Sequence, residues 1–138
     1  MKFIPVFKPY IEKPEIDAAT EALKMGWLGM GSYVDEFEKQ ISSICELDED
    51  SFAVSVSTGH AALHWSLLIL GVGKGDEVIT PSFNNSADFQ AIVATGASPV
   101  FVDVNENDLC LNIESVEKAI TKNTKCIISM DYDLFLCN

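Results

Sequence analysis

The segment Ser57-Thr58-Gly59-His60, here called the 57–60 turn, has the residue types of a phosphate-binding turn. It follows a β-branched run and precedes an apolar stretch with helical spacing, so it should join a strand to a helix. The first N–H groups of a helix lack partners within the helix, and the helix dipole adds partial positive charge there. Ser57 and Thr58 can add hydroxyl donors, while Gly59 allows the backbone to approach a ligand closely. The residues alone also allow a simpler interpretation, a tight turn without a ligand.

Two other motifs could bind ligands, and both are rejected. The segment 71–76 resembles a P-loop, but no strand precedes it, and Asp76 stands where a Ser or Thr should hold Mg²⁺. His60 and His64 lie one helical turn apart, but Ala61 occupies the position of the acidic residue in a zinc-protease helix. The sequence therefore predicts no metal site.

The composition restricts the possible partners. The chain has 138 residues with 21 Asp or Glu, nine Lys and no Arg, which gives a net charge of −12. Such a chain offers no basic surface for phosphate backbones, so nucleic acid and anionic membranes are not expected partners. The longest apolar run, residues 65–72, is far shorter than the roughly 20 residues of a membrane-spanning helix. No secretion signal is evident, and the four cysteines form no C-x-x-C pair, so we expect a cytoplasmic protein with free, mostly buried thiols.

Apolar periodicity predicts the elements that position the turn. Helices are expected at residues 15–25, 32–44, 61–70, 87–94 and 113–120, and strands at residues 53–57, 77–80, 100–104 and 126–130. Ser32 and Asp35 resemble a capping box, and Gly26 is a plausible helix stop. The later strands are apolar on both faces and alternate with helices, which predicts an α/β fold with a parallel sheet covered on both sides.

Several landmarks stand in order along the chain: Gly26-Trp27-Leu28 with Gly31, Phe37-Glu38, the segment 57–64, the segment 75–83 and the segment 96–104. With this order and spacing, the chain resembles the N-terminal half of the large domain in the DegT/StrS-type family of pyridoxal-phosphate-dependent sugar aminotransferases. The resemblance begins at Ile4 and ends at about Ser129. It implies a partial large domain of the fold-type-I transferases, a three-layer α/β/α architecture with a mostly parallel sheet.

The resemblance also implies a domain organisation. Residues 1–50 correspond to the N-terminal helical segment of the family, residues 51–129 to part of the cofactor-binding α/β domain, and residues 130–138 to a tail outside the family pattern. In the family, strands from elsewhere in the protein separate the strand at residues 53–57 from the next three.

The cofactor implied by the resemblance is pyridoxal 5′-phosphate, bound by Ser57, Thr58, Gly59, His60 and Asn85. The family residues matching Gly59 and His60 hold the cofactor phosphate through backbone N–H groups, and here His60 replaces a threonine. Asn85 stands where the family has an aromatic ring stacked on the pyridine, and a planar amide can still lie against that ring with less apolar contact. The other interpretation of Asn85, as a helix cap, stays open.

The activity implied by the resemblance is transfer of an amino group from an amino-acid donor to a nucleotide-linked keto-sugar, within a homodimer. The Schiff-base lysine and the aspartate at the pyridine nitrogen lie further along the family's sequence, and none of the nine lysines stands in the family's lysine motif. We therefore expect a truncated fragment, inactive alone and without catalytic residues. The alternative is a non-catalytic α/β module that binds a phosphorylated ligand or a partner protein. Trp27, in a loop near the family's active site, is either a substrate contact or, as we expect, a buried anchor.

Overall fold

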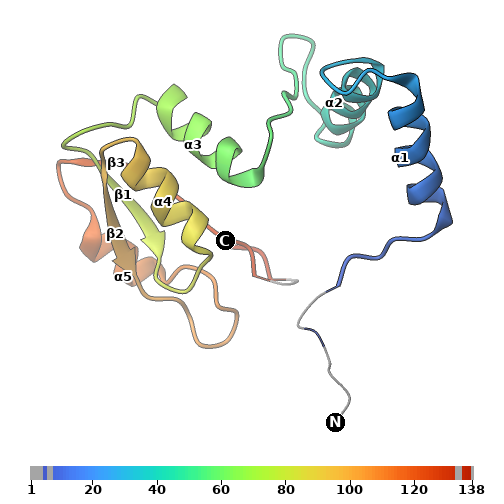
Figure 1. Cartoon of the computed structure of the whole chain (residues 1–138). Helices are drawn as coiled ribbons and strands as arrows, with labels where there is room; N and C mark the ends of the chain where they lie inside the picture. Colours follow the sequence, from blue (N-terminus) through green and yellow to red (C-terminus); the bar gives the residue numbers. More distant parts are fainter. Residues whose placement is uncertain (1–4, 6–7, 133–134, 138) are drawn as a thin grey trace. The chain divides into compact units, whose positions relative to one another are not determined.

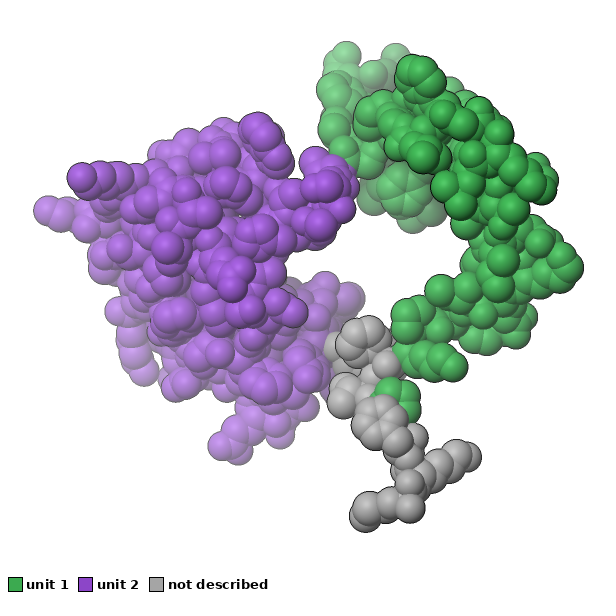
Figure 2. Space-filling model, in the orientation of Figure 1, with its two compact units in different colours: residues 1–55 green, residues 56–138 purple. Residues whose placement is uncertain are grey.

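The computed structural model describes residue 5 and residues 8–132 and 135–137 (Figure 1). Ile4, where the resemblance begins, and residues 133–134 and 138 of the expected tail lie outside the described residues. The chain forms two compact units, residues 1–55 and residues 56–138 (Figure 2). The elements are α1 (Lys13–Met25), α2 (Ser32–Ile44), α3 (Gly59–Ile69), β1 (Glu77–Pro81), α4 (Ser86–Ala94), β2 (Ser98–Val102), α5 (Ile113–Ala119) and β3 (Thr124–Ile127).

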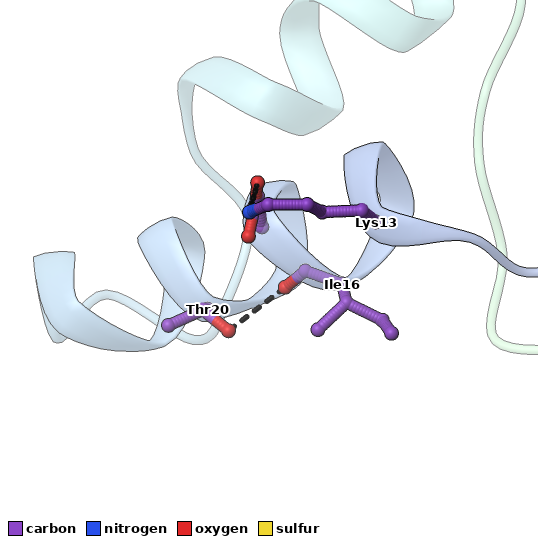
Figure 3. A network of polar contacts seen from close by, with 4 residues as sticks. Lys13, Ile16 and Thr20 are labelled. Carbon is purple, nitrogen blue, oxygen red and sulfur yellow. Dashed lines mark hydrogen bonds and ion pairs between the residues drawn. The ribbon is translucent and has the colours of Figure 1, made fainter.

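Helix α1 has well-formed ends. Glu12 and Glu15 form a reciprocal capping box, in which the Glu12 N–H donates to Glu15 Oε2 at 2.8 Å. At the other end Gly26 adopts a left-handed conformation with φ of 73°, which confirms the predicted stop, and its N–H donates to the carbonyl of Leu23. An ion pair also connects successive turns of the helix, where Lys13 Nζ lies 2.6 Å from Asp17 Oδ2 (Figure 3).

Helix α2 begins differently from the prediction. Gly31 is its N-cap in an extended conformation, and no side chain caps the helix. The capping box predicted at Ser32 and Asp35 is therefore wrong. The reason is that Ser32 already lies inside the first turn, one residue too late to accept a hydrogen bond from the third helical residue.

The prediction of a strand at residues 53–57 is also wrong, because no strand among the described residues pairs with this extended segment. The N–H of Ala53 donates to Ser42 Oγ at 2.9 Å. The N–H and the hydroxyl of Ser55 donate to Glu38 Oε1 at 2.7 and 2.6 Å. A strand needs a paired neighbour, and within the described residues the segment has none. Polar side chains thus hold one edge of the segment.

The sheet of the second unit is parallel, with the order β2-β1-β3. In the central strand, Ile79 is aligned with Val100 on one side and with Ile127 on the other. The three later strands of the prediction are confirmed, with β2 and β3 each displaced by about two residues toward the N-terminus. Pairing with β1 sets these ends, which apolar runs alone do not specify.

Successive side chains of β1 point to opposite faces of the sheet and supply two core clusters, one between each pair of layers. Val78 is fully buried under α3 and α4, where it packs in a cluster with Leu67, Val72, Ala91, Ile92 and Ala97. Ile79 is fully buried on the opposite face, in a cluster with Val102, Leu111 and Val116 of the α5 side. The predicted three-layer α/β/α architecture is therefore confirmed, and all three strands are parallel.

Three further findings concern the cysteines, metal ligands and membrane-spanning helices. Cys110 is buried, Cys126 and Cys137 are half-buried and Cys45 is exposed, so the expectation of mostly buried thiols holds for Cys110 alone. In the described part of the chain, no three His, Cys, Asp or Glu side chains gather as a metal site would require. No helix there has the length and apolar character needed to cross a membrane.

Candidate functional site

Two helix N-termini lie at one edge of the sheet. Helix α3 leads by a turn into β1, and α4 leads by a turn into β2, so both helices run against the direction of the parallel strands (Figure 1). Their N-termini therefore lie at the carboxyl edge of the sheet, where open α/β sheets bind ligands. Ser57 and Thr58 directly precede α3, and Gly59 and His60 are its first two residues. Asn85 is the N-cap of α4, which packs against α3.

At the start of α3, two backbone donors have no acceptor in the part of the chain that the structure describes. Thr58 is the N-cap, and its Oγ1 accepts a hydrogen bond from the Ala61 N–H at 3.0 Å. Its carbonyl accepts from the Ala62 N–H, also at 3.0 Å. Within the described residues, the N–H groups of Gly59 and His60 have no acceptor. They are therefore available to an external anion.

The charge and space around these donors favour an anion. Of the five helices that the structure describes, α3 alone has no acidic residue in its first turn, whereas each other helix has one: Glu15, Asp35, Asp88 and Glu114. The first turn of α3 thus provides no carboxylate to compensate the positive end of the helix dipole. A Cβ atom on Gly59 would meet no atom within 4 Å, so the space in front of the turn is open. The residues present therefore fit a phosphate group.

Asn85 caps α4. Its Oδ1 accepts a hydrogen bond from the Ala87 N–H at 2.9 Å, which confirms the helix-cap interpretation. The side chain stays exposed, and the cap fixes the plane of its amide. The contact with a cofactor ring stays a prediction, and the cap is compatible with it because only one edge of the amide is used.

Sequence reasoning missed Asn84 and Asp88, which support this cap. The amide of Asn84 donates through Nδ2 to Asp88 Oδ2 and accepts through Oδ1 from the Asn85 N–H, the latter at 2.6 Å. Asp88 is only 8% exposed, and burial raises the pKa of its carboxyl while the hydrogen bond from Asn84 opposes that rise. Two polar residues spaced four apart at the start of an apolar helix were the available signal.

Trp27 belongs to the first unit and is not the buried anchor that we expected. The side chain is 69% exposed, because α1 and α2 bury no residue and so provide no core for it. Its indole Nε1 donates to the Met30 carbonyl at 2.5 Å, and the ring lies against Gly31. Trp27 and Tyr33 help to line a pocket of about 480 Å³ beside the start of α2.

Comparison with known proteins gives one consistent result. Residues 9–133 match the DegT/DnrJ/EryC1/StrS aminotransferase family. Among solved structures, DesV from S. venezuelae is 40% identical with a TM-score of 0.76, and 84% of this chain is covered. The PLP form of Spr1654 from Streptococcus pneumoniae, a proposed sugar aminotransferase, is 34% identical with a TM-score of 0.81 over 90% of this chain. TlmJ, an aminotransferase from Streptoalloteichus hindustanus, is 35% identical with a TM-score of 0.82 over 91%.

The likeness covers only part of each relative. The matched region spans 31% of the DesV and Spr1654 chains and 34% of the TlmJ chain. The chain therefore spans about a third of the length of these structures. The family match also ends at residue 133, inside the segment 130–138 that the sequence analysis assigned to a tail.

Proposed function

The chain belongs to the DegT/DnrJ/EryC1/StrS aminotransferase family, and on that premise we propose that its protein transfers amino groups with pyridoxal 5′-phosphate as cofactor. The observation that carries the proposal is the pair of N–H groups of Gly59 and His60, which have no acceptor among the described residues, in a first helical turn without acidic residues. When bound, the cofactor supplies the electron sink that amino-group transfer requires.

In this proposal the residues of the 57–60 turn bind and orient the cofactor phosphate. The N–H groups of Gly59 and His60 donate to phosphate oxygens, and the hydroxyls of Ser57 and Thr58 add donors. The Thr58 hydroxyl can donate while its oxygen still accepts from Ala61, because a hydroxyl does both. Asn85 lies over the ring. None of these groups moves a proton, so their role is binding.

We also propose the finer expectations of the family. The substrates are a nucleotide-linked keto-sugar and an amino-acid donor, and the protein acts in the cytoplasm as a homodimer. The 138-residue polypeptide contains no lysine in the family's lysine motif, so we expect it to bind cofactor without turning it over.

Binding of vitamin B6 phosphates tests the proposal. Pyridoxine 5′-phosphate is the suitable probe, because its alcohol replaces the aldehyde and so cannot react with the nine lysines. Calorimetric titration should show tighter binding of pyridoxine 5′-phosphate than of pyridoxine. The matched variants are Gly59→Pro and His60→Ala. Proline is tolerated at the first helical position, after the extended Thr58, and removes one N–H donor, whereas His60→Ala keeps its N–H.

We expect Gly59→Pro to weaken binding about tenfold, the value of one charge-assisted hydrogen bond, and His60→Ala to stay within about twofold of wild type. Binding of pyridoxine and its phosphate with equal affinity would reject the phosphate site. A preference for inorganic phosphate over the pyridoxine phosphate would favour the non-catalytic module instead.

A further inference from the structure

A continuous set of hydrogen bonds connects the buried start of α4 to Asn85. Asp88 accepts from the Asn84 amide, whose own oxygen accepts from the Asn85 N–H at 2.6 Å. Asn85 in turn accepts from the Ala87 N–H at 2.9 Å, and the Asp88 N–H donates to the Asn85 carbonyl at 3.3 Å. The loop before α4 is therefore fixed on both sides of Asn85.

This arrangement allows only one orientation of Asn84. Its amide uses both ends, with the NH₂ group toward the Asp88 carboxylate and the oxygen toward the Asn85 N–H. A flipped amide would set its oxygen against the carboxylate and its NH₂ group against an N–H donor. The contact with Asp88 thus selects the orientation of the Asn84 amide in which its oxygen accepts from the Asn85 N–H.

The position of Asp88 is energetically unfavourable for a charged side chain. It is 8% exposed, and among the described residues it forms no ion pair. Burying a carboxylate without a cation costs folding free energy, although the dipole of α4 and the amide of Asn84 offset part of the cost. Energetically unfavourable residues concentrate at functional sites, and the buried carboxyl group of Asp88 supports a residue of the proposed cofactor site.

We propose that Asn84 and Asp88 are positioning residues, which hold the Asn85 amide in the orientation that contacts the cofactor ring. The inference rests on the proposed function and assigns to this pair a role in ring recognition, separate from phosphate binding by the 57–60 turn.

The test compares two ligands, pyridoxine 5′-phosphate and inorganic phosphate, by calorimetric titration of the whole chain. Asp88→Ala and Asn84→Ala remove the contact, while Asp88→Asn keeps an oxygen that accepts from Asn84. Gln90→Ala is the matched control, since Gln90 is an exposed residue of the same helix. The double variant Asn84→Ala with Asp88→Asn removes the pair without leaving a buried unpaired charge, and it decides the question if a single variant fails to fold.

We expect Asp88→Ala and Asn84→Ala to weaken binding of pyridoxine 5′-phosphate about five- to tenfold and to leave inorganic phosphate within twofold. Asp88→Asn and Gln90→Ala should bind both ligands like wild type. A purely structural role would weaken both ligands together, so equal losses, or no loss for the variants, would overturn the positioning role while the proposed function stands. Absence of any phosphate-dependent binding in the wild type would overturn both.

Discussion

The two units of the chain contrast in how their apolar residues are used. In residues 56–138, β1 buries four consecutive side chains and serves two core clusters. In residues 1–55, α1 and α2 bury none, and Ile16 and Leu23 are 57% and 64% exposed. Helices α1 and α2 have clear amphipathic periodicity, whereas α3 and α4 are apolar on most sides. The periodicity therefore predicts which face of a helix is apolar, but burial depends on a partner surface that the local pattern does not specify.

The largest expected effect comes from truncating the same residue type in each unit. Ile79→Ala should lower the free energy of unfolding by about 2–5 kcal/mol, because Ile79 is fully buried and its loss leaves a cavity. Ile16→Ala in α1 should have little effect. Urea titration followed by circular dichroism measures both. Equal losses for the two variants would show that the first unit has a core after all.

Helix capping gives the next largest difference. Thr58→Ala removes the side-chain cap of α3 and should cost about 1 kcal/mol. Ser32→Ala should be close to neutral, because no side chain caps α2 and Ser32 lies within its first turn. Thermal unfolding of both variants is the measurement, and a larger loss for Ser32→Ala would contradict the observed helix starts.

The contact between Glu38 and Ser55 should depend on pH. The hydroxyl and N–H of Ser55 donate to the Glu38 carboxylate, which lowers the pKa of Glu38 below the usual 4.5. A lowered pKa means that the folded unit prefers the charged form. The stabilisation is therefore complete above the pKa of an unfolded glutamate and is lost as the pH falls through the folded-state value.

Glu38→Gln isolates this contact. The variant keeps an acceptor oxygen without the charge, so protection of the Ser55 N–H against hydrogen exchange at neutral pH should fall about fivefold. The pH dependence of that protection should disappear in the variant. Retention of the dependence would assign it to another group.

The smallest effect is expected for the exposed ion pair of α1 (Figure 3). Lys13 and Asp17 are 84% and 58% exposed in their side chains, and solvent screens such pairs strongly. Lys13→Gln should change the urea midpoint by less than the error of the titration. A clear loss would mean that polar surface contacts, in place of a core, hold the first unit together.

Much of the fold could be predicted from the sequence, since the five helices and three later strands follow from local periodicity and turn residues such as Gly26. The prediction of a strand at residues 53–57 was wrong because strand pairing is non-local, and no strand among the described residues pairs with the segment. The N-cap of α2 was predicted wrongly because Gly31 and Ser32 are both acceptable at that position. Their backbone conformations decide which of them is the N-cap.

The candidate site was also predictable only where it depends on local sequence. The 57–60 turn is contiguous, and a strand-like run before a helix already indicates free N–H groups at its start. The contact between Asn84 and Asp88 depends on how the loop before α4 bends, which no spacing rule specifies. The exposure of Trp27 was missed because a large aromatic residue is usually assigned to a core, and the described residues of the first unit include no buried residue.

The exposed indole of Trp27 has a practical consequence. The chain has two tryptophans, Trp27 before α2 and Trp65 in α3, so each unit carries one tryptophan. Trp27→Phe and Trp65→Phe would each leave a single tryptophan, and the two melting curves followed by tryptophan emission would report the units separately. Coincident curves would identify one cooperative transition, and displaced curves would give each unit its own midpoint.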